Sequence, residues 1–159
     1  MSDLPPLSGI RVADFSRVLA GPLATMTLAD LGAVVTKVER PGAGDDTRQW
    51  GPPWTEHSSS YFACVNRSKR SVALDLRVDD DLRVARALAR ESDVLVENFR
   101  TGTMHRLGLG YDDLAGDNPG IVYCSITGFG SGPGEALPGY DFVVQAVGGL
   151  MSITGDHDG

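Results

Sequence analysis

The sequence predicts an α/β fold built on an open parallel sheet. Short apolar runs typical of strands alternate with segments of helical periodicity along most of the chain. The first 40 residues show the pattern most clearly, as strand, turn, helix and strand. Because a connection of this length crosses over the sheet, the two strands of the unit should be parallel.

The first unit extends from Leu7 to Arg40. Residues 10–15 form a short apolar run bounded by turn residues, which predicts a buried strand. A helix is predicted over residues 21–31, with Pro22 in its first turn and Gly32 as its C-terminal stop. Its apolar side chains recur near helical spacing at Leu23, Met26, Leu28 and Leu31. Residues 33–39 are rich in β-branched side chains and predict the second strand.

Residues 40–70 form a long connection rich in Gly, Pro and Ser. Two tryptophans and the run YFACV predict a packed loop with a short helix near residues 58–65. The connection ends in a basic run that contains Arg67, Lys69 and Arg70. On charge alone this run is typical of a solvated loop, and the alternative is a phosphate-facing patch before a strand.

Two further strand–helix pairs follow the connection. Strands are predicted over residues 71–76 and 93–98. Between them lies an amphipathic helix from Asp79, its expected N-cap, to about residue 92. A short helix capped by Thr101 and another turn of helix at 111–115 precede the fifth strand, residues 121–126.

The last part of the chain begins with a glycine-rich segment, residues 127–134, which predicts a mobile active-site loop. It lacks the Gly-Lys-Ser/Thr of a P-loop. A final helix is predicted over residues 141–150. Its buried side chains should be Val143, Val144, Val147 and Leu150.

Composition excludes several classes of protein. Hydrophobic residues make up 42% of the 159 residues and charged residues 22%, which is typical of a globular domain. The net charge of −7 argues against nucleic acid as a partner. Cys64 and Cys124 have no metal-ligand spacing, so we expect buried, reduced thiols. The absence of a membrane-spanning apolar run and of a signal peptide predicts a cytoplasmic protein without membrane association.

Ligands of open parallel sheets bind at the carboxyl ends of the strands, which directs attention to residues 16–22 and 40–44. A dinucleotide is one candidate ligand, and Glu39 occupies the place of a ribose-binding carboxylate. However, the first turn has one glycine rather than the three of GxGxxG, so the sequence argues against a dinucleotide site. The residues themselves identify no catalytic group.

At these loops the chain resembles the class III CoA-transferases, the family that includes formyl-CoA transferase, carnitine CoA-transferase and α-methylacyl-CoA racemase. The resemblance covers nearly the whole chain in the family's order. Six segments carry it: LSGIRVADFSRVLAGP, DLGAVVTKVERPGAGDDTR, YFACVNRSKRSVALDL, DVLVENFRTGTMHRLGLGYDDL, NPGIVYCSITGFGSGPG and PGYDFVVQAVGGLMSITG.

The resemblance implies a Rossmann-like open parallel sheet with helices on both faces. Residues 1–159 would be the N-terminal part of the large CoA-binding domain, with the rest of that domain and a small domain absent. No tightly bound cofactor is implied, because coenzyme A enters as the thioester substrate. The expected partners are an acyl-CoA, a carboxylic acid and a second subunit, in an interlocked homodimer.

By the same resemblance, a CoA site is expected at the strand ends identified above. It comprises first-turn backbone, basic residues for the phosphates, apolar contacts and a residue near the thioester. The matching positions are Val18, Leu19, Ala20, Arg40, Leu74, Asn98, Phe99, Arg106 and Tyr140. The alternative roles are surface ion pairs for Arg40 and Arg106 and a core position for Leu74.

Three departures from the family pattern bear on substrate and reaction. Formyl-CoA transferase has a glutamine where this chain has Leu19 and a lysine where it has Thr127, which puts formyl-CoA and oxalate in doubt. The surrounding sequence is closer to members that use succinyl-CoA and a dicarboxylate. Racemases carry Gly-His-Asp where this chain has Gly139-Tyr140-Asp141. Because a phenol has an ordinary pKa of about 10, Tyr140 favours transfer over racemisation.

The family reaction uses an aspartate that forms a mixed anhydride with the acyl group and then an enzyme-bound thioester. That aspartate is expected beyond Gly159, so no catalytic residue is predicted here and the 159 residues alone should be inactive. Asp141 should cap the last helix, and the remaining candidates should be structural: Asp14, Asp75, Asp156 and Asp158. An acyl-CoA racemase and a non-catalytic CoA-binding fragment remain alternatives.

Overall fold

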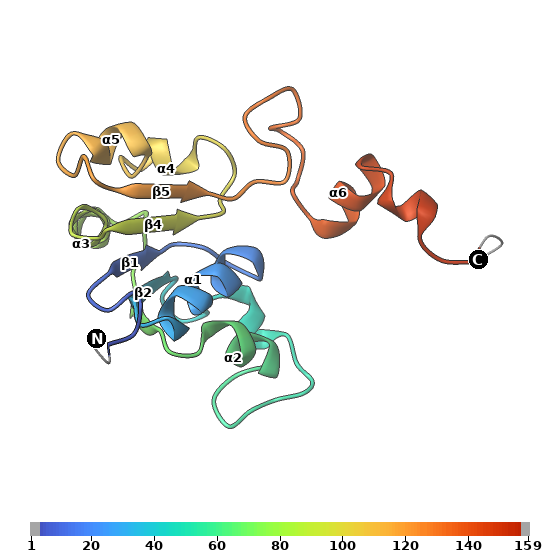
Figure 1. The fold of residues 1–159 in the computed structure, drawn as a ribbon, viewed down its shortest axis with the longest axis horizontal. Helices are drawn as coiled ribbons and strands as arrows, with labels where there is room; N and C mark the ends of the chain where they lie inside the picture. Colours follow the sequence, from blue (N-terminus) through green and yellow to red (C-terminus); the bar gives the residue numbers. More distant parts are fainter. Residues whose placement is uncertain (1–3, 157–159) are drawn as a thin grey trace.

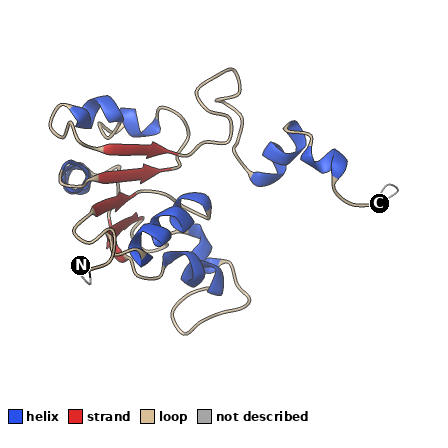
Figure 2. Cartoon of the chain, viewed as in Figure 1, coloured by secondary structure: helices blue, strands red, loops and turns tan. Residues whose placement is uncertain are grey.

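The computed structural model describes residues 4–156. Its centre is a five-stranded sheet in the order β3-β2-β1-β4-β5, in which every neighbouring pair is parallel. The strands are β1 (Arg11–Asp14), β2 (Val34–Glu39), β3 (Arg70–Ala73), β4 (Val94–Glu97) and β5 (Val122–Ser125). Figure 2 shows them side by side with helices around them, which confirms the predicted α/β fold. The order reverses direction between β1 and β4, the place where such sheets form a crevice.

The helices divide between the two faces of the sheet. The chain forms α1 (Ala20–Asp30), α2 (Ser60–Asn66), α3 (Asp79–Arg90), α4 (Thr103–Arg106) and α5 (Tyr111–Ala115). One core cluster joins Val12, Val35 and Val96 to the apolar side of α1. The other joins Ala13, Phe15 and Leu95 to residues of α3, α4 and α5. Because successive strand residues face opposite sides of the sheet, Val12 and Ala13 belong to different core clusters.

The predicted N-caps of α3 and α4 differ from the observed ones. The N-cap of α3 is Val78, whose extended backbone and hydrogen bond to the Asp75 carbonyl fix the start, so Asp79 is the first helical residue instead. The N-cap of α4 is Gly102 rather than Thr101. Gly102 adopts φ +77°, a left-handed conformation that glycine reaches without the steric cost that threonine would meet.

The long connection between β2 and β3 packs against α1 through its helix α2. The prediction of a packed loop is wrong for Trp50 and Trp54, which are 47% and 59% exposed. The connection contains the 3-10 helix η1 (Asp46–Gln49) and α2, which begins after Ser59, whose hydroxyl accepts a hydrogen bond from the Phe62 N–H. The interpretation of its basic run as a solvated loop is wrong for Lys69. The ammonium of Lys69 is buried and lies 3.0 Å from the carboxylate of Asp14, which is also buried.

The helix α6 (Asp141–Val147) and the 3-10 helix η2 (Leu150–Ile153) extend away from the sheet (Figure 1). The predicted burial of this segment is wrong, because Val147 and Leu150 are exposed and α6 has no buried residue. The helix also ends at Val147, before Gly148 and Gly149. Asp141 does not cap it, since Tyr140 holds the N-cap position and the Asp141 carboxylate accepts a hydrogen bond from Gln145 instead.

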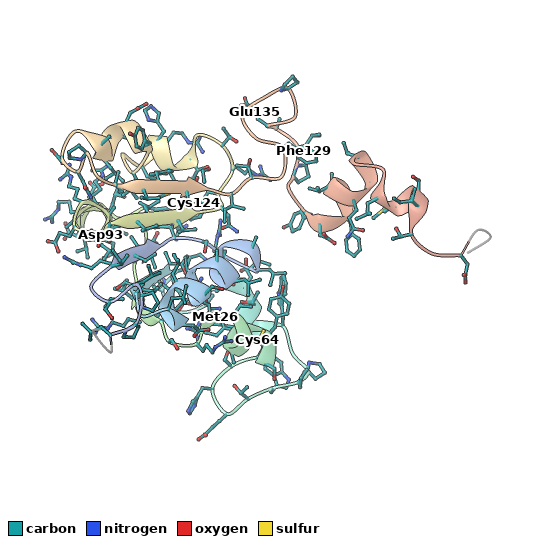
Figure 3. The ribbon with its side chains drawn as sticks, viewed as in Figure 1. Met26, Cys64, Asp93, Cys124, Phe129 and Glu135 are labelled. Atoms are coloured by element: carbon teal, nitrogen blue, oxygen red, sulfur yellow. The ribbon has the colours of Figure 1, made fainter. Side chains whose placement is uncertain are left out.

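Both cysteines are free thiols, as predicted, and Figure 3 shows them on separate elements, α2 and β5. The prediction that both are buried is wrong, because Cys64 is exposed and Cys124 is only partly buried. Residues 4–156 contain no helix long and apolar enough to cross a membrane. The cytoplasmic location stays a prediction. Asp158 lies outside the described residues.

Candidate functional site

A cleft of about 570 Å³ opens at the carboxyl edge of the sheet. Its lining comes from the ends of β1 to β4, from the loop after β2 and from α4. Apolar side chains and cations share this lining. They include Phe15, Leu74, Leu76, Phe99 and Leu107 on the apolar side and Arg17, Lys37, Arg40 and Arg77 among the cations. Such a mixture suits an elongated anion with an apolar or aromatic part.

The turn after β1 is held by side chains that reach it from other strands. The buried ammonium of Lys37 donates to the Ser16 carbonyl at 2.7 Å. The Asn98 amide accepts from the Arg17 N–H at 2.8 Å and donates to the Arg17 carbonyl at 2.7 Å. The Val18 N–H lies 3.3 Å from a carboxylate oxygen of Asp45. These contacts hold Val18 at φ +69°, a conformation that a β-branched residue rarely adopts.

Lys37 and Asp45 form a fully buried ion pair beneath this turn. Their charged atoms are 3.0 Å apart, and the side chains are 1% and 0% exposed. Burial raises the pKa of Asp45, but the charge of Lys37 and two hydrogen bonds from Thr47 outweigh it, so the pKa is lowered. Asp45 is therefore an anion that links the β2–α2 connection to the turn after β1.

A second ionic cluster centres on Glu39 at the end of β2. Arg48 donates two hydrogen bonds of 2.7 Å to the two carboxylate oxygens, and Ser71 and the Asp45 N–H donate one each. Burial raises the pKa of Glu39, but these donors lower it to about 2. Glu39 is thus engaged within the protein instead of presenting its carboxylate to a ribose, which agrees with the absence of a dinucleotide motif.

A third buried group, Asp14 at the end of β1, stabilises the turn that follows this strand. Its carboxylate accepts hydrogen bonds from the Ser16 and Thr25 hydroxyls and from Lys69. Lys69 also donates to the Pro22 carbonyl at 2.9 Å. Burial lowers the pKa of Lys69, although the adjacent Asp14 opposes that shift. Lys69 therefore fixes the two ends of the turn rather than facing a phosphate, and the expected structural role of Asp14 agrees with this packing.

The chain matches a known protein family over most of its length. The model of CoA-transferase family III matches residues 7–159. The chain belongs to this family. The resemblance found in the sequence is confirmed over almost its full extent.

Individual members of CoA-transferase family III are also similar over the whole chain. Succinyl-CoA:glutarate CoA-transferase of Mus musculus is 52% identical over 98% of the chain, and succinate–glutarate CoA-transferase of Agrobacterium fabrum is 50% identical over 98%. A CAIB/BAIF family protein from Brucella suis, known from its crystal structure, has a TM-score of 0.93 and 47% identity over 99%. The chain spans 36%, 40% and 43% of these three proteins, respectively.

The structure brings three of the residues expected in the family's CoA site, Arg40, Leu74 and Phe99, into the cleft lining. Arg40 also pairs with Asp46 at the protein surface. Val18 lies in the turn after β1, next to the cleft residue Arg17, and Asn98 holds this turn from the end of β4. Their direct contact with CoA stays a prediction.

Four other predicted positions lie outside the cleft lining. Leu19 and Ala20 are exposed at the start of α1. Arg106 is exposed and donates to the Thr103 hydroxyl. Tyr140 is 71% exposed at the start of α6, a helix that extends away from the sheet (Figure 1). Contact of these residues with CoA also stays a prediction.

Sequence reasoning missed Arg17, Lys37, Asp45 and Arg77. Arg17 could have been found, because it directly follows a strand whose end was already identified as a binding edge. Arg77 lies in the cleft lining and pairs with Asp75 at 2.8 Å. Lys37 and Asp45 gave no signal, since a lysine in a strand and an aspartate in a loop are both ordinarily solvated.

The carboxylates of the cleft lining do not provide a free nucleophile. Glu39, Asp45 and Asp75 are each paired with a cation. Within residues 4–156 no group of three or more His, Cys, Asp or Glu side chains could hold a metal ion. This part of the family III fold supplies cations, apolar surface and a turn held by hydrogen bonds.

Proposed function

We propose that the whole protein is a CoA-transferase that moves CoA between an acyl-CoA thioester and a carboxylic acid acceptor. Residues 1–159 would form the N-terminal part of its large CoA-binding domain. The observation that carries the proposal is the 52% identity to a succinyl-CoA:glutarate CoA-transferase over 98% of the chain. The cleft at the carboxyl edge supports it, because its cations and apolar side chains suit the phosphates and adenine of CoA.

Succinyl-CoA as donor and a dicarboxylate such as glutarate as acceptor are the substrates we propose. Both relatives named above carry succinate or succinyl-CoA together with glutarate in their names. Leu19 is consistent with this choice, because its apolar side chain, 45% exposed at the start of α1, offers no hydrogen bond to a formyl or oxalyl group.

The catalytic step would use an aspartate outside these 159 residues. Its carboxylate attacks the thioester carbonyl, the carbon–sulfur bond breaks, and CoA leaves as a thiolate while an acyl anhydride forms. The thiolate then attacks the aspartyl carbonyl of the anhydride, which releases the donor acid and leaves an aspartyl-CoA thioester. The acceptor carboxylate attacks this thioester to give a second aspartyl anhydride and again a CoA thiolate. Attack of the thiolate on the acceptor acyl carbon forms the new acyl-CoA and frees the aspartate. The cation-paired state of Glu39, Asp45 and Asp75 supports a nucleophile located elsewhere.

An interlocked homodimer is the assembly we propose for the whole protein. The apolar residues left exposed on α6 and η2, including Phe142 and Ile153, would be covered in that assembly. Sedimentation equilibrium of the full-length protein tests it. A mass of twice the subunit would support the dimer, and a monomer would contradict it.

Assay of the full-length protein tests the reaction. The protein is incubated with succinyl-CoA and glutarate, and glutaryl-CoA is measured by mass spectrometry, with a panel of mono- and dicarboxylic acids as further acceptors. Formation of glutaryl-CoA without hydrolysis would support the proposal. In a parallel reaction in D₂O, α-deuteration of a 2-methylacyl-CoA without CoA transfer would instead establish the racemase. If neither reaction occurs, the remaining alternative is a non-catalytic protein that binds CoA.

A further inference from the structure

Among the cations that line the cleft, Arg17 differs from the others in its partners. Lys37 pairs with Asp45 and Arg77 pairs with Asp75. Arg40 pairs with Asp46. Within residues 4–156, the guanidinium of Arg17 makes neither an ion pair nor a side-chain hydrogen bond, and its one specific contact is with an aromatic ring. A partly buried cation that has no counter-charge within these residues is available to pair with an anionic ligand.

The position of Arg17 is fixed at both its backbone and its side chain. The Asn98 amide holds its backbone N–H and carbonyl. The guanidinium carbon lies 4.5 Å from the centroid of the Phe99 ring. Stacking of this kind occupies the face of a guanidinium and leaves the N–H groups along its edge available for an oxyanion.

The topology of the sheet places this arrangement where a ligand is expected. Arg17 follows β1, and Asn98 and Phe99 follow β4. These two strands are neighbours at the point where the strand order reverses. Ligands of doubly wound sheets occupy the crevice outside this point. The cleft there is lined by both Arg17 and Phe99.

We propose that Arg17 binds a phosphate group of the CoA thioester through its guanidinium edge, while Phe99 holds the guanidinium plane in the cleft. This inference rests on the proposed function. Phosphate fits better than a single carboxylate because the apolar lining from Phe15, Leu74 and Leu107 adjoins Arg17, as the adenosine part of CoA would require. The phosphate is either in the diphosphate bridge or at the ribose 3′ position.

The test compares the full-length wild-type protein with Arg17→Gln by isothermal titration calorimetry. Three probes are titrated: CoA, 3′-dephospho-CoA and pantetheine. Arg83→Gln is the matched control, because Arg83 carries the same charge but is 71% exposed on α3 and pairs with Asp80 there. Arg17→Lys keeps the charge while removing the planar fork, and thermal unfolding of each variant establishes that it is folded.

The proposal predicts that Arg17→Gln weakens CoA binding roughly 10- to 100-fold and leaves pantetheine binding unchanged. Arg17→Lys should recover part of the affinity, and Arg83→Gln should bind CoA as the wild type does. An equal loss for 3′-dephospho-CoA would assign the diphosphate. A loss confined to CoA would assign the 3′-phosphate.

Two results would overturn the inference. Unchanged CoA affinity in Arg17→Gln is the first. The second is an equal loss for CoA and pantetheine, which would show a general disturbance of the turn. Wild-type protein that binds no CoA would contradict the proposed function as well, so the two failures are distinguishable.

Discussion

The side-chain amide of Asn98 holds the backbone of Arg17 from both sides, with hydrogen bonds of 2.8 Å from the Arg17 N–H and 2.7 Å to the Arg17 carbonyl. The two residues are 81 positions apart in sequence and meet because β1 and β4 are neighbours in the sheet. Since both the oxygen and the nitrogen of the amide are engaged, we expect Asn98 to position the turn rather than to depend on the ligand for a partner.

Asn98→Ala is predicted to weaken CoA binding about tenfold and to lower the free energy of unfolding by about 1–3 kcal/mol, because two backbone groups lose their partner. Asn118→Ala is the matched control. Asn118 likewise makes two hydrogen bonds to the backbone, both as donor to the carbonyls of Arg90 and Ser92, but at the opposite edge of the sheet. It should lose comparable stability in urea titrations and keep its CoA affinity. Equal CoA affinity in both variants would contradict the positioning role.

Asp45→Asn is predicted to lower the free energy of unfolding by about 3–5 kcal/mol, because the buried ammonium of Lys37 would lose its counter-charge. The double variant Lys37→Met/Asp45→Asn should recover part of this loss, since neither charge of this buried pair remains. Urea unfolding at pH 7 measures both. Asp80→Asn, which removes an exposed partner of Arg83, is the control and should change stability by under about 1 kcal/mol. A loss as small as this in Asp45→Asn would refute the buried pair.

Stability should depend on pH through Glu39. Its pKa is lowered in the folded protein from 4.5 to about 2, so the stabilisation is present above pH 4.5 and is lost as the pH falls towards 2. Glu39→Gln is therefore predicted to cost about 3 kcal/mol at pH 7 and progressively less below pH 4.5. Urea titrations of both proteins from pH 7 to pH 3 measure this difference.

The control for Glu39 is Glu91→Gln, whose exposed pair with Arg11 should contribute under about 1 kcal/mol at any pH. A difference between wild type and Glu39→Gln that stays constant from pH 7 to pH 3 would argue against an ionised, hydrogen-bonded Glu39.

Gly21→Ala is predicted to destabilise the protein by about 1–3 kcal/mol and to weaken CoA binding, because the added Cβ would collide with the side chain of Ser16 in the held turn. Gly116→Ala serves as the control, since a Cβ there meets nothing within 4 Å. Thermal unfolding and CoA titration of both variants provide the comparison. Wild-type behaviour of Gly21→Ala would show that the turn can shift without loss.

The sequence predicted the parallel sheet and the edge at which the cleft lies, because both follow from local periodicity and a general rule of parallel sheets. It could not predict that Lys37 and Lys69 point inward. Lysine is ordinarily solvated, and Asp14, the partner of Lys69, is 55 positions away in sequence. Asp45, the partner of Lys37, lies in a loop whose path the local periodicity does not reveal. The burial of α6 was also wrongly predicted, because an apolar pattern does not reveal whether a covering surface lies within these residues.

The predicted site residues likewise divide into those whose position the sheet determines and those whose position it does not. Arg40, Leu74 and Phe99 reach the cleft because they lie at strand ends, where topology alone determines proximity. Tyr140 belongs to a segment that follows a glycine-rich loop, and no strand fixes its position relative to the sheet. Its place near a thioester therefore remains a prediction from the family resemblance.

The most direct test of the account is a crystal structure of the full-length protein with CoA bound. The account predicts that the nucleotide end of CoA occupies the carboxyl-edge cleft, with Phe99 beside it and a phosphate oxygen within about 3 Å of the Arg17 guanidinium. CoA bound elsewhere, with this cleft empty or filled by another part of the protein, would contradict it.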